Sequence, residues 1–213
     1  MKRIILLLVF ITSALCLSAQ DGIMKDFEIS GDLRMGSNYL PLFGIHASEN
    51  VALYTELMAI HKSGLGVGYF AFDDFMESRI RFVDVLYTNS WGKASLYGAM
   101  EYVWYDNSDA ICLMPYIIGT YTSGSWAFQA ANMMSCFPRS SEGKYEFTAY
   151  AKVMKNIFKD IDLHVTVWYD SLYKSHFYGA TGIKVSLPKG FYVMGTLLHR
   201  ENTECLVNFG WHF

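Results

Sequence analysis

The chain has 213 residues and a formal net charge of −3, with 52% hydrophobic and 16% aromatic residues. The length suits one domain, and the slight acidic excess argues against nucleic-acid binding. This hydrophobic and aromatic content is high for a soluble exported domain. Beyond residue 20, however, no apolar run approaches the roughly 20 residues that a membrane-spanning helix needs. The longest run, Ala110 to Ile118, contains Pro115.

Residues 1–20 have the three-part layout of a secretory signal peptide. Two basic residues precede an apolar run from Ile4 to Leu17, and small residues follow it. We therefore expect cleavage near Ala19 or Gln20, because the run is short for an uncleaved membrane anchor. The mature protein would then be a single domain, residues 21–213, with 15 Lys plus Arg against 20 Asp plus Glu and a net charge of −5.

Beyond the signal peptide, apolar and polar residues alternate over many short segments, a pattern typical of strands with one apolar and one wet face. In one example, Tyr145, Phe147 and Val153 fall opposite Glu146 and Lys152. The segments are close to the about 9–11 residues of a tilted membrane strand. We expect strands at about 27–36, 50–62, 65–74, 79–89, 93–105, 110–121, 125–136, 144–155, 160–170, 177–187, 190–199 and 203–213.

The last predicted strand carries the most specific pattern. A polar residue, Asn208, and a glycine, Gly210, precede Trp211 and the final Phe213, with aromatic side chains alternating along one face. This strand resembles the carboxy-terminal β-signal of bacterial outer-membrane barrels. The resemblance covers this strand alone, and it implies a bacterial outer-membrane location, contact with outer-membrane lipids, and insertion by the barrel-assembly machinery.

The connections between predicted strands differ in length on the two sides of the sheet. If the first strand runs outward, the periplasmic turns are short and contain Gly, Pro, Asn or Ser, as at 61–64 and 187–190. The other side includes the longest connection, 37–49. Short turns on one side and longer loops on the other are typical of outer-membrane barrels. We predict an all-β fold, a closed antiparallel up-and-down transmembrane β-barrel of about 12 strands, in the range of about 10–14.

The alternation turns a set of polar residues toward the barrel interior. A charge in a lumen is costly unless water or a partner compensates it, so the set predicts either a narrow water-filled pore or a network that plugs the barrel. Acids outnumber bases in the set, which predicts an acidic lumen that prefers cations if it is open. Inward side chains at Tyr97, Tyr150, Trp168 and Tyr178 would narrow the bore. The predicted lumen-lining polar residues are Glu28, Asp32, Arg34, Glu56, Asp84, Glu101, Glu146, Lys152, Asp162, His164, Lys184 and Glu204.

Three of the four cysteines lie beyond residue 20, so at least one is unpaired within a monomer. If the chain turns around Gly124, Cys112 and Cys136 lie directly across from one another at the outer rim. An oxidising envelope permits a disulfide there, although cross-strand geometry is often strained. The positions allow a Cys112–Cys136 bond and, equally, two free thiols. Cys205 is expected on the lipid face as a small apolar residue.

The sequence contains no His-Glu-x-x-His, Gly-x-Ser-x-Gly or Cys-x-x-Cys motif. We therefore expect no cofactor and no metal, and we expect a non-enzymatic role over an enzymatic one. An outer-membrane hydrolase acting on lipid or peptide is a further alternative, in which His164 and Asp162 lie two apart on one strand face and His199 or His212 assists. A structural hydrogen bond is the favoured interpretation of the Asp162–His164 pair.

The segment 37–46 is apolar for an exposed loop. It would either fold into the lumen as a plug, which we favour, or form a contact surface. The second possibility suggests a structural barrel that docks an envelope lipoprotein or a larger complex. The leading prediction is the narrow or plugged pore, followed by the partner barrel and then the hydrolase.

Overall fold

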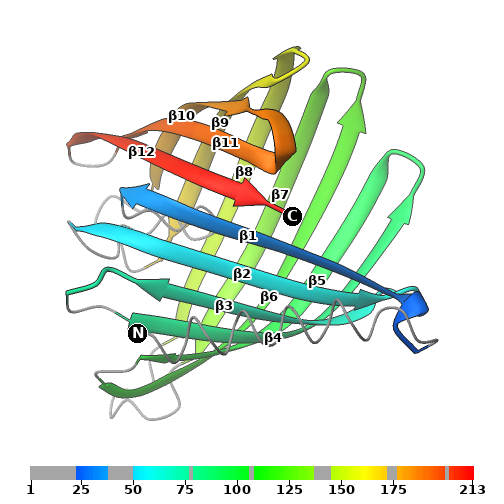
Figure 1. Ribbon diagram of the computed structural model, residues 1–213. Helices are drawn as coiled ribbons and strands as arrows, with labels where there is room; N and C mark the ends of the chain where they lie inside the picture. Colours follow the sequence, from blue (N-terminus) through cyan, green and yellow to red (C-terminus); the bar gives the residue numbers. More distant parts are fainter. Residues whose placement is uncertain are drawn as a thin grey trace.

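The computed structural model describes residues 23–37, 50–76, 79–105, 108–136, 145–171, 177–199 and 202–213. These residues form a closed barrel in which every strand pairs with its neighbours in chain order and β1 pairs with β12 (Figure 1). All pairs are antiparallel. The predicted fold class, a closed up-and-down barrel of 12 strands, is confirmed.

The strands are β1 (Phe27–Ser37), β2 (Val51–His61), β3 (Leu65–Asp73), β4 (Arg79–Trp91), β5 (Ala94–Tyr105), β6 (Ser108–Ser123), β7 (Trp126–Cys136), β8 (Tyr145–Phe158), β9 (Ile161–Asp170), β10 (Phe177–Ser186), β11 (Phe191–His199) and β12 (Thr203–His212), with two short 3₁₀ helices, η1 (Ile23–Asp26) and η2 (Pro188–Gly190). Every predicted strand has a counterpart. The largest difference is at β8, which continues to Phe158 rather than ending at 155. Among the helices of the described ranges, none has the length and apolar character to cross a bilayer.

Alternation along the strands separates an inner from an outer face. In β4, Ile80, Phe82, Asp84 and Leu86 are buried inside, whereas Val83 and Val85, which alternate with them, are exposed. The same period runs through the other strands, and their exposed positions are mostly Val, Leu, Ile, Phe, Tyr and Trp. An apolar belt that surrounds a closed sheet is suited to lipid, because every ladder hydrogen bond is satisfied within the barrel.

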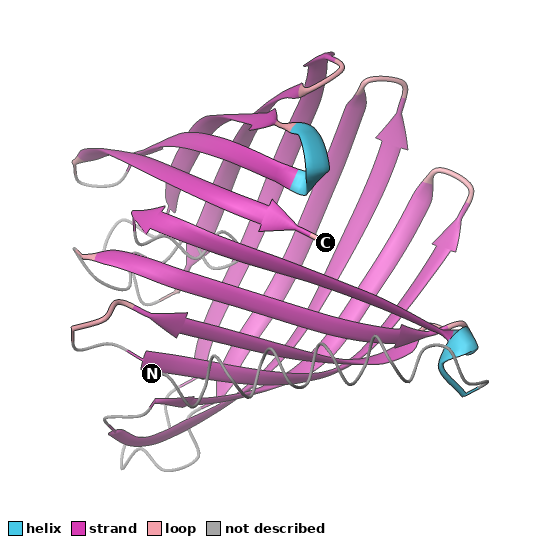
Figure 2. Cartoon of the chain, viewed as in Figure 1, coloured by secondary structure: helices cyan, strands magenta, loops and turns pink. Residues whose placement is uncertain are grey.

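The hairpin connections at one end of the barrel are tight, and we call this end the turn end (Figure 2). They contain glycines with positive φ, namely Gly64 (88°), Gly92 (59°), Gly124 (59°) and Gly190 (82°). Only glycine adopts this backbone region without strain, so these residues permit turns of a few residues. The opposite end, which we call the loop end, carries the remaining connections. The segment 38–49, which contains most of the predicted plug 37–46, lies outside the described residues.

The barrel closes where β12 meets β1. Asp32 to Gly36 pair with His212 to Asn208, and beyond them Phe213 and Gly31 exchange two backbone hydrogen bonds of 3.0 and 2.8 Å. The predicted β-signal residues therefore lie along the seam. Asn208 and Gly210 are buried, while Trp211 and Phe213 are exposed. The ring of Tyr192 lies against Gly210, where a Cβ would overlap it.

One predicted pairing is wrong by a single residue. The two-residue turn at Gly124 pairs Ser123 with Trp126, and this register places Cys136 opposite Leu113 rather than Cys112. A one-residue shift moves a side chain to the other face of a strand. Cys112 is therefore buried in the interior, whereas Cys136 shares the outer face with Leu113. The Cys112–Cys136 disulfide is not formed, and both thiols, like that of Cys205, are free.

Candidate functional site

The interior face of the barrel is defined by pairs of residues that lie opposite one another on adjacent strands and project to the same side. Asp32 pairs with Glu56, Glu56 with Phe70, and Phe70 with Phe82. Phe70 and Phe82 are buried in the interior, so Asp32 and Glu56 point inward as well. By the same parity, the inward positions of their strands hold the rest of the predicted set, namely Glu28, Arg34, Asp84, Glu101, Glu146, Lys152, Asp162, His164, Lys184 and Glu204.

The half of the lumen nearer the loop end is filled with apolar side chains. Trp168 is only 1% exposed and stacks on Tyr178 across the β9–β10 pair, with ring centroids 5.3 Å apart. Phe72 and Leu198 are buried at the same end, on other strands. Sequence reasoning foresaw the narrowing by Tyr150, Trp168 and Tyr178 but missed the apolar set around them. The buried core also contains Phe70, Phe82, Val103, Cys112, Met114, Ile118, Met133 and Leu206.

Two acids lie in the middle of the lumen on the β4–β5 wall. Asp84 and Glu101 pair directly across the strands, and they are 0% and 3% exposed. Tyr116 Oη donates a 2.6 Å hydrogen bond to Asp84 Oδ2, and Tyr97 Oη donates a longer one of 3.3 Å. Asp84 Oδ1 and Glu101 Oε2 have no hydrogen-bond partner among the described residues. This wall therefore contains two buried carboxyl oxygens that no hydrogen-bond donor of the described residues satisfies.

A second group of polar residues links acids to bases through aromatic rings on β1, β2 and β11. Tyr192 Oη lies 2.8 and 2.9 Å from the two carboxylate oxygens of Asp32. Arg34 lies over the ring of Tyr54, 4.4 Å from its centroid, while Tyr54 Oη donates a 3.3 Å hydrogen bond to Glu56. Such contacts order charged side chains along the wall without placing them in direct ion pairs.

The turn-end half of the lumen contains a cavity of about 390 Å³ on the side of β6 to β11. Its ionisable lining residues are Lys152 of β8, Asp162 and His164 of β9, and Lys184 of β10. In the sheet, Lys184 pairs with Asp162 and Gly182 with His164. The imidazole of His164 lies against Gly182, where a Cβ would overlap it. This close approach keeps the ring along the wall and leaves the cavity open.

The structure brings Asp162 and His164 into one cavity but gives Asp162 a different partner. Asn156 Nδ2 donates a 2.9 Å hydrogen bond to Asp162 Oδ1. His199 lies at the loop end, where its Nδ1 is 3.2 Å from Thr203 Oγ1, and His212 lies near the turn end on β12. The histidines are therefore not assembled into one site, and among the described residues no serine is hydrogen-bonded to His164.

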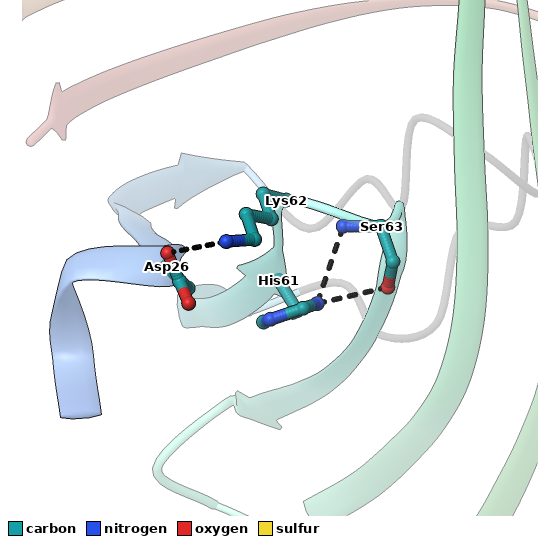
Figure 3. Close-up of polar contacts among 4 residues, drawn as sticks. All are labelled: Asp26, His61, Lys62 and Ser63. Atoms are coloured by element: carbon teal, nitrogen blue, oxygen red, sulfur yellow. Dashed lines mark hydrogen bonds and ion pairs between the residues drawn. The ribbon is translucent and has the colours of Figure 1, made fainter.

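A second cavity, of about 530 Å³, lies at the turn end between the start of β1 and the ends of β2 and β4, and Glu28 is among its lining residues. Figure 3 shows the polar contacts beside it: Lys62 Nζ is 3.0 Å from Asp26 Oδ1, and His61 Nδ1 is 2.9 Å from Ser63 Oγ. These contacts fix the β2–β3 turn. Within the described ranges, no group of three or more His, Cys, Asp or Glu side chains is placed to hold a metal ion.

The remaining predicted lumen residues, Glu146 and Glu204, lie at the loop ends of β8 and β12, away from both cavities. The structure also buries polar residues that sequence reasoning left out, including Asp74, Asp170 and Thr196. Each of the last two occupies an inward position of its strand, so the alternation alone was sufficient to find them.

Neither a family model nor a curated protein matches the chain. Solved structures do match its fold. A KdgM porin superposes with a TM-score of 0.64 at 12% identity, over 86% of this chain and 98% of that one. A KdgM porin in complex with disordered oligogalacturonate gives 0.61 at 13% identity, with the same coverage. A NanC porin in a rhombohedral crystal form gives 0.54 at 13% identity, over 86% and 97%. The chain thus has the barrel fold of these porins.

Proposed function

We propose that this barrel is a narrow pore in a bacterial outer membrane. The observation that carries the proposal is the cavity of about 390 Å³ inside the barrel, walled by Lys152, His164 and Lys184. Charged side chains inside a sheet whose outer face is apolar need water or a counterion, because burying them alone costs several kcal/mol. A wet interior within a lipid-facing barrel is the arrangement that a pore requires.

The shared fold supports the same function. The porins that superpose on the chain are matched over nearly their full length, so this barrel has the fold and approximate size of proteins named as porins. Fold similarity does not by itself assign a function. It adds to the proposal here because the lumen of this chain also contains charged groups and an open cavity.

The pore is proposed to be narrow because its loop-end half is packed. Trp168, Phe72 and Leu198 are buried in the interior and leave little room between opposite walls. About eight strands give a barrel filled by side chains and about 16 give an open channel, so a barrel of this size lies between the two cases. Passage through this half would be limited to small solutes and ions.

The proposed lumen prefers cations. Asp84 and Glu101 form the β4–β5 wall at mid-depth, and no lysine, arginine or histidine forms an ion pair with them among the described residues. Two buried acids this close do not both ionise, so the wall carries at most one negative charge near neutral pH, and that charge favours cations over anions. The preference would therefore originate at this pair rather than at the lysine-lined cavity below it.

Planar-bilayer recording tests both parts of the proposal. The folded protein should produce small stepwise currents, and a KCl gradient should give a reversal potential of the sign expected for cation preference. The double variant Asp84→Asn, Glu101→Gln should move the reversal potential toward zero because it removes both carboxyl groups. The matched control is Asp73→Asn, at the loop end of β3, which removes a carboxylate paired with Arg79 at 3.2 Å.

A bilayer that stays silent at good protein loading contradicts the pore. Currents whose selectivity does not respond to the double variant leave the pore intact and contradict the assignment of selectivity to Asp84 and Glu101.

Delivery to the outer membrane is part of the proposal. We propose that residues 1–20 are removed during export and that the strand ending in Phe213 is read by the barrel-assembly machinery, with outer-membrane lipids around the apolar belt. Folded barrels commonly migrate faster in detergent gels before heating than after it, and membrane fractionation should recover the protein with the outer membrane. Recovery as a soluble periplasmic monomer contradicts this localisation.

A further inference from the structure

We propose that the turn-end cavity binds the phosphate group of a small solute, held by Lys152 and Lys184. The cavity, of about 390 Å³, falls within the range of about 300–1,000 Å³ that is usual for small-molecule sites. The inference deepens the proposed function, because it rests on a solute entering the lumen, and it names the chemistry of that solute. The lining reaches the turn residues Gly124 and Ser125, so the anion enters from the turn end without passing the Asp84–Glu101 wall.

The two lysines carry charges that the protein itself does not neutralise. Among the described residues, one ion pair joins Lys62 to Asp26 and another joins Arg79 to Asp73, and neither includes a lysine of the cavity. Lys184 Nζ lies 4.3 Å from the ring centroid of Tyr192, which positions the ammonium group without cancelling its charge. Two half-buried ammonium groups beside one cavity therefore favour an anion between them.

Asp162 is the single acid of the cavity lining, and it is already engaged. It pairs with Lys184 in the strand register, but its carboxylate accepts a hydrogen bond from Asn156 and no ion pair with Lys184 forms. Two lysines against one acid leave the wall positively charged. This cavity therefore differs in sign from the Asp84–Glu101 wall at mid-depth.

The surrounding groups favour phosphate over a single carboxylate. The lining adds the imidazole of His164 and the hydroxyl group of Ser125 to the two ammonium groups, whereas the Thr122 hydroxyl already donates to the carbonyl oxygen of Lys93. A phosphate group offers three strong acceptor oxygens and about two negative charges, so it can satisfy several donors and both lysines at once. Lysine is a common phosphate binder that acts as a point charge.

Isothermal titration of the folded barrel in detergent with sodium phosphate tests the inference, at constant ionic strength and with sodium chloride as the reference titration. Wild-type protein should bind phosphate, and the double variant Lys152→Gln, Lys184→Gln should lose about tenfold or more in affinity. Asp162→Asn should bind more tightly than wild type, because it removes the one acid from the lining. Heat-modifiable migration verifies that each variant is folded.

The matched control is Lys155→Gln, on the same strand as Lys152. Lys155 is exposed and lies over Trp126, with Nζ 4.6 Å from the ring centroid, so its loss removes a charge of the same sign outside the lining. Phosphate affinity should not change in this variant. An equal loss in Lys155→Gln and in the double variant overturns the inference, because the attraction would then be a general effect of charge.

Parallel titrations with glycerol phosphate and with bicelles that contain phosphatidic acid distinguish a soluble source of the phosphate group from a lipid source. Binding of free phosphate or glycerol phosphate supports the inference, and binding confined to phosphatidic acid overturns it. The outcome is separable from that of the pore. A silent bilayer with intact phosphate binding removes the pore alone, and a conducting barrel without phosphate binding removes this site alone.

Discussion

The two halves of the lumen are built by the same strands yet differ in chemistry. The loop-end half is a packed core around Phe72, Trp168 and Leu198, whereas the turn-end half holds a cavity lined by Lys152 and Lys184. The outer face is apolar over both halves. The closed sheet therefore determines which side chains point into the lumen. The chemistry of those inward residues determines whether a given depth of the lumen is packed or contains water.

Under the proposed function, the loop-end half chiefly stabilises the barrel, and the turn-end half chiefly admits solutes. A packed interior contributes burial energy, about 1.5–3 kcal/mol for each large apolar side chain removed from water. Charged walls around a cavity contribute little to stability, but they attract ions and solutes. We expect substitutions at the loop end to alter both stability and bore, and substitutions of the lysines to alter binding with little loss of stability.

Replacing Trp168 by alanine should have the largest effect, because it opens space in the packed loop-end half and makes it more like the turn-end half. The ring is 1% exposed and stacks on Tyr178 at 5.3 Å. Its removal should destabilise the barrel by about 3–5 kcal/mol and leave a void in the packed half. Single-channel conductance should rise, and the temperature at which the barrel unfolds in detergent gels should fall.

Phe147→Ala is the control for Trp168→Ala, because it removes an aromatic ring from the outer face of β8 and leaves the lumen unchanged. Its conductance should match that of wild type. If Trp168→Ala conducts like wild type as well, the loop-end core is not the narrow part of the pore.

Gly210→Ala should have the next largest effect, at the seam of the turn-end half. A Cβ there would overlap the ring of Tyr192, whose Oη bonds to Asp32. Displacing the ring should cost about 1–3 kcal/mol and loosen the pairing of β12 with β1. Thermal unfolding measured by circular dichroism or gel migration should reveal the loss.

Gly195→Ala, on β11, is the matched control for the seam. A Cβ at this position meets Ile183 Cγ2 at 3.8 Å, an ordinary van der Waals contact. The unfolding temperature should stay close to that of wild type. Equal losses in both glycine variants would mean that glycine matters here for strand backbone conformation rather than for the approach of Tyr192.

Much of the fold was predictable from the sequence because a barrel has a simple period. Alternation of two residues and tight turns with glycine were sufficient to place all the strands and the closed antiparallel order. The apolar core of the loop-end half was not foreseen, because the strands that build it are apolar on both faces. In β4, the inner residues Ile80 and Phe82 are followed directly by the outer residue Val83, and all three are apolar. A period of two residues does not show which of two apolar faces is the inner one.

The candidate site was predictable as a set of residues but not as an arrangement. The alternation selects Lys152, His164 and Lys184 as inward residues, yet their gathering around one cavity depends on the register between three strands. The separation of Asp84 and Glu101 from any cationic partner depends on which strands stand opposite them. The sequence does not reveal the distances among these three residues, nor the distance from the two acids to a basic side chain, because both depend on how the sheet closes.

The prediction with the smallest expected effect on stability and conductance tests the β6–β7 register, which places Cys112 on the inner face and Cys136 on the outer face. Leu113 pairs with Cys136 on the outer face, and Cys112 lies inside the packed half. Leu113→Cys, made together with Cys112→Ser, should therefore form a disulfide with Cys136 under oxidising conditions, whereas wild type should not link its own two thiols. The link should appear as a mobility shift of the unfolded protein in non-reducing gels, with conductance unchanged. A mobility shift in the wild type and none in the variant would mean that β7 is displaced by one residue relative to β6, with Cys136 on the interior face.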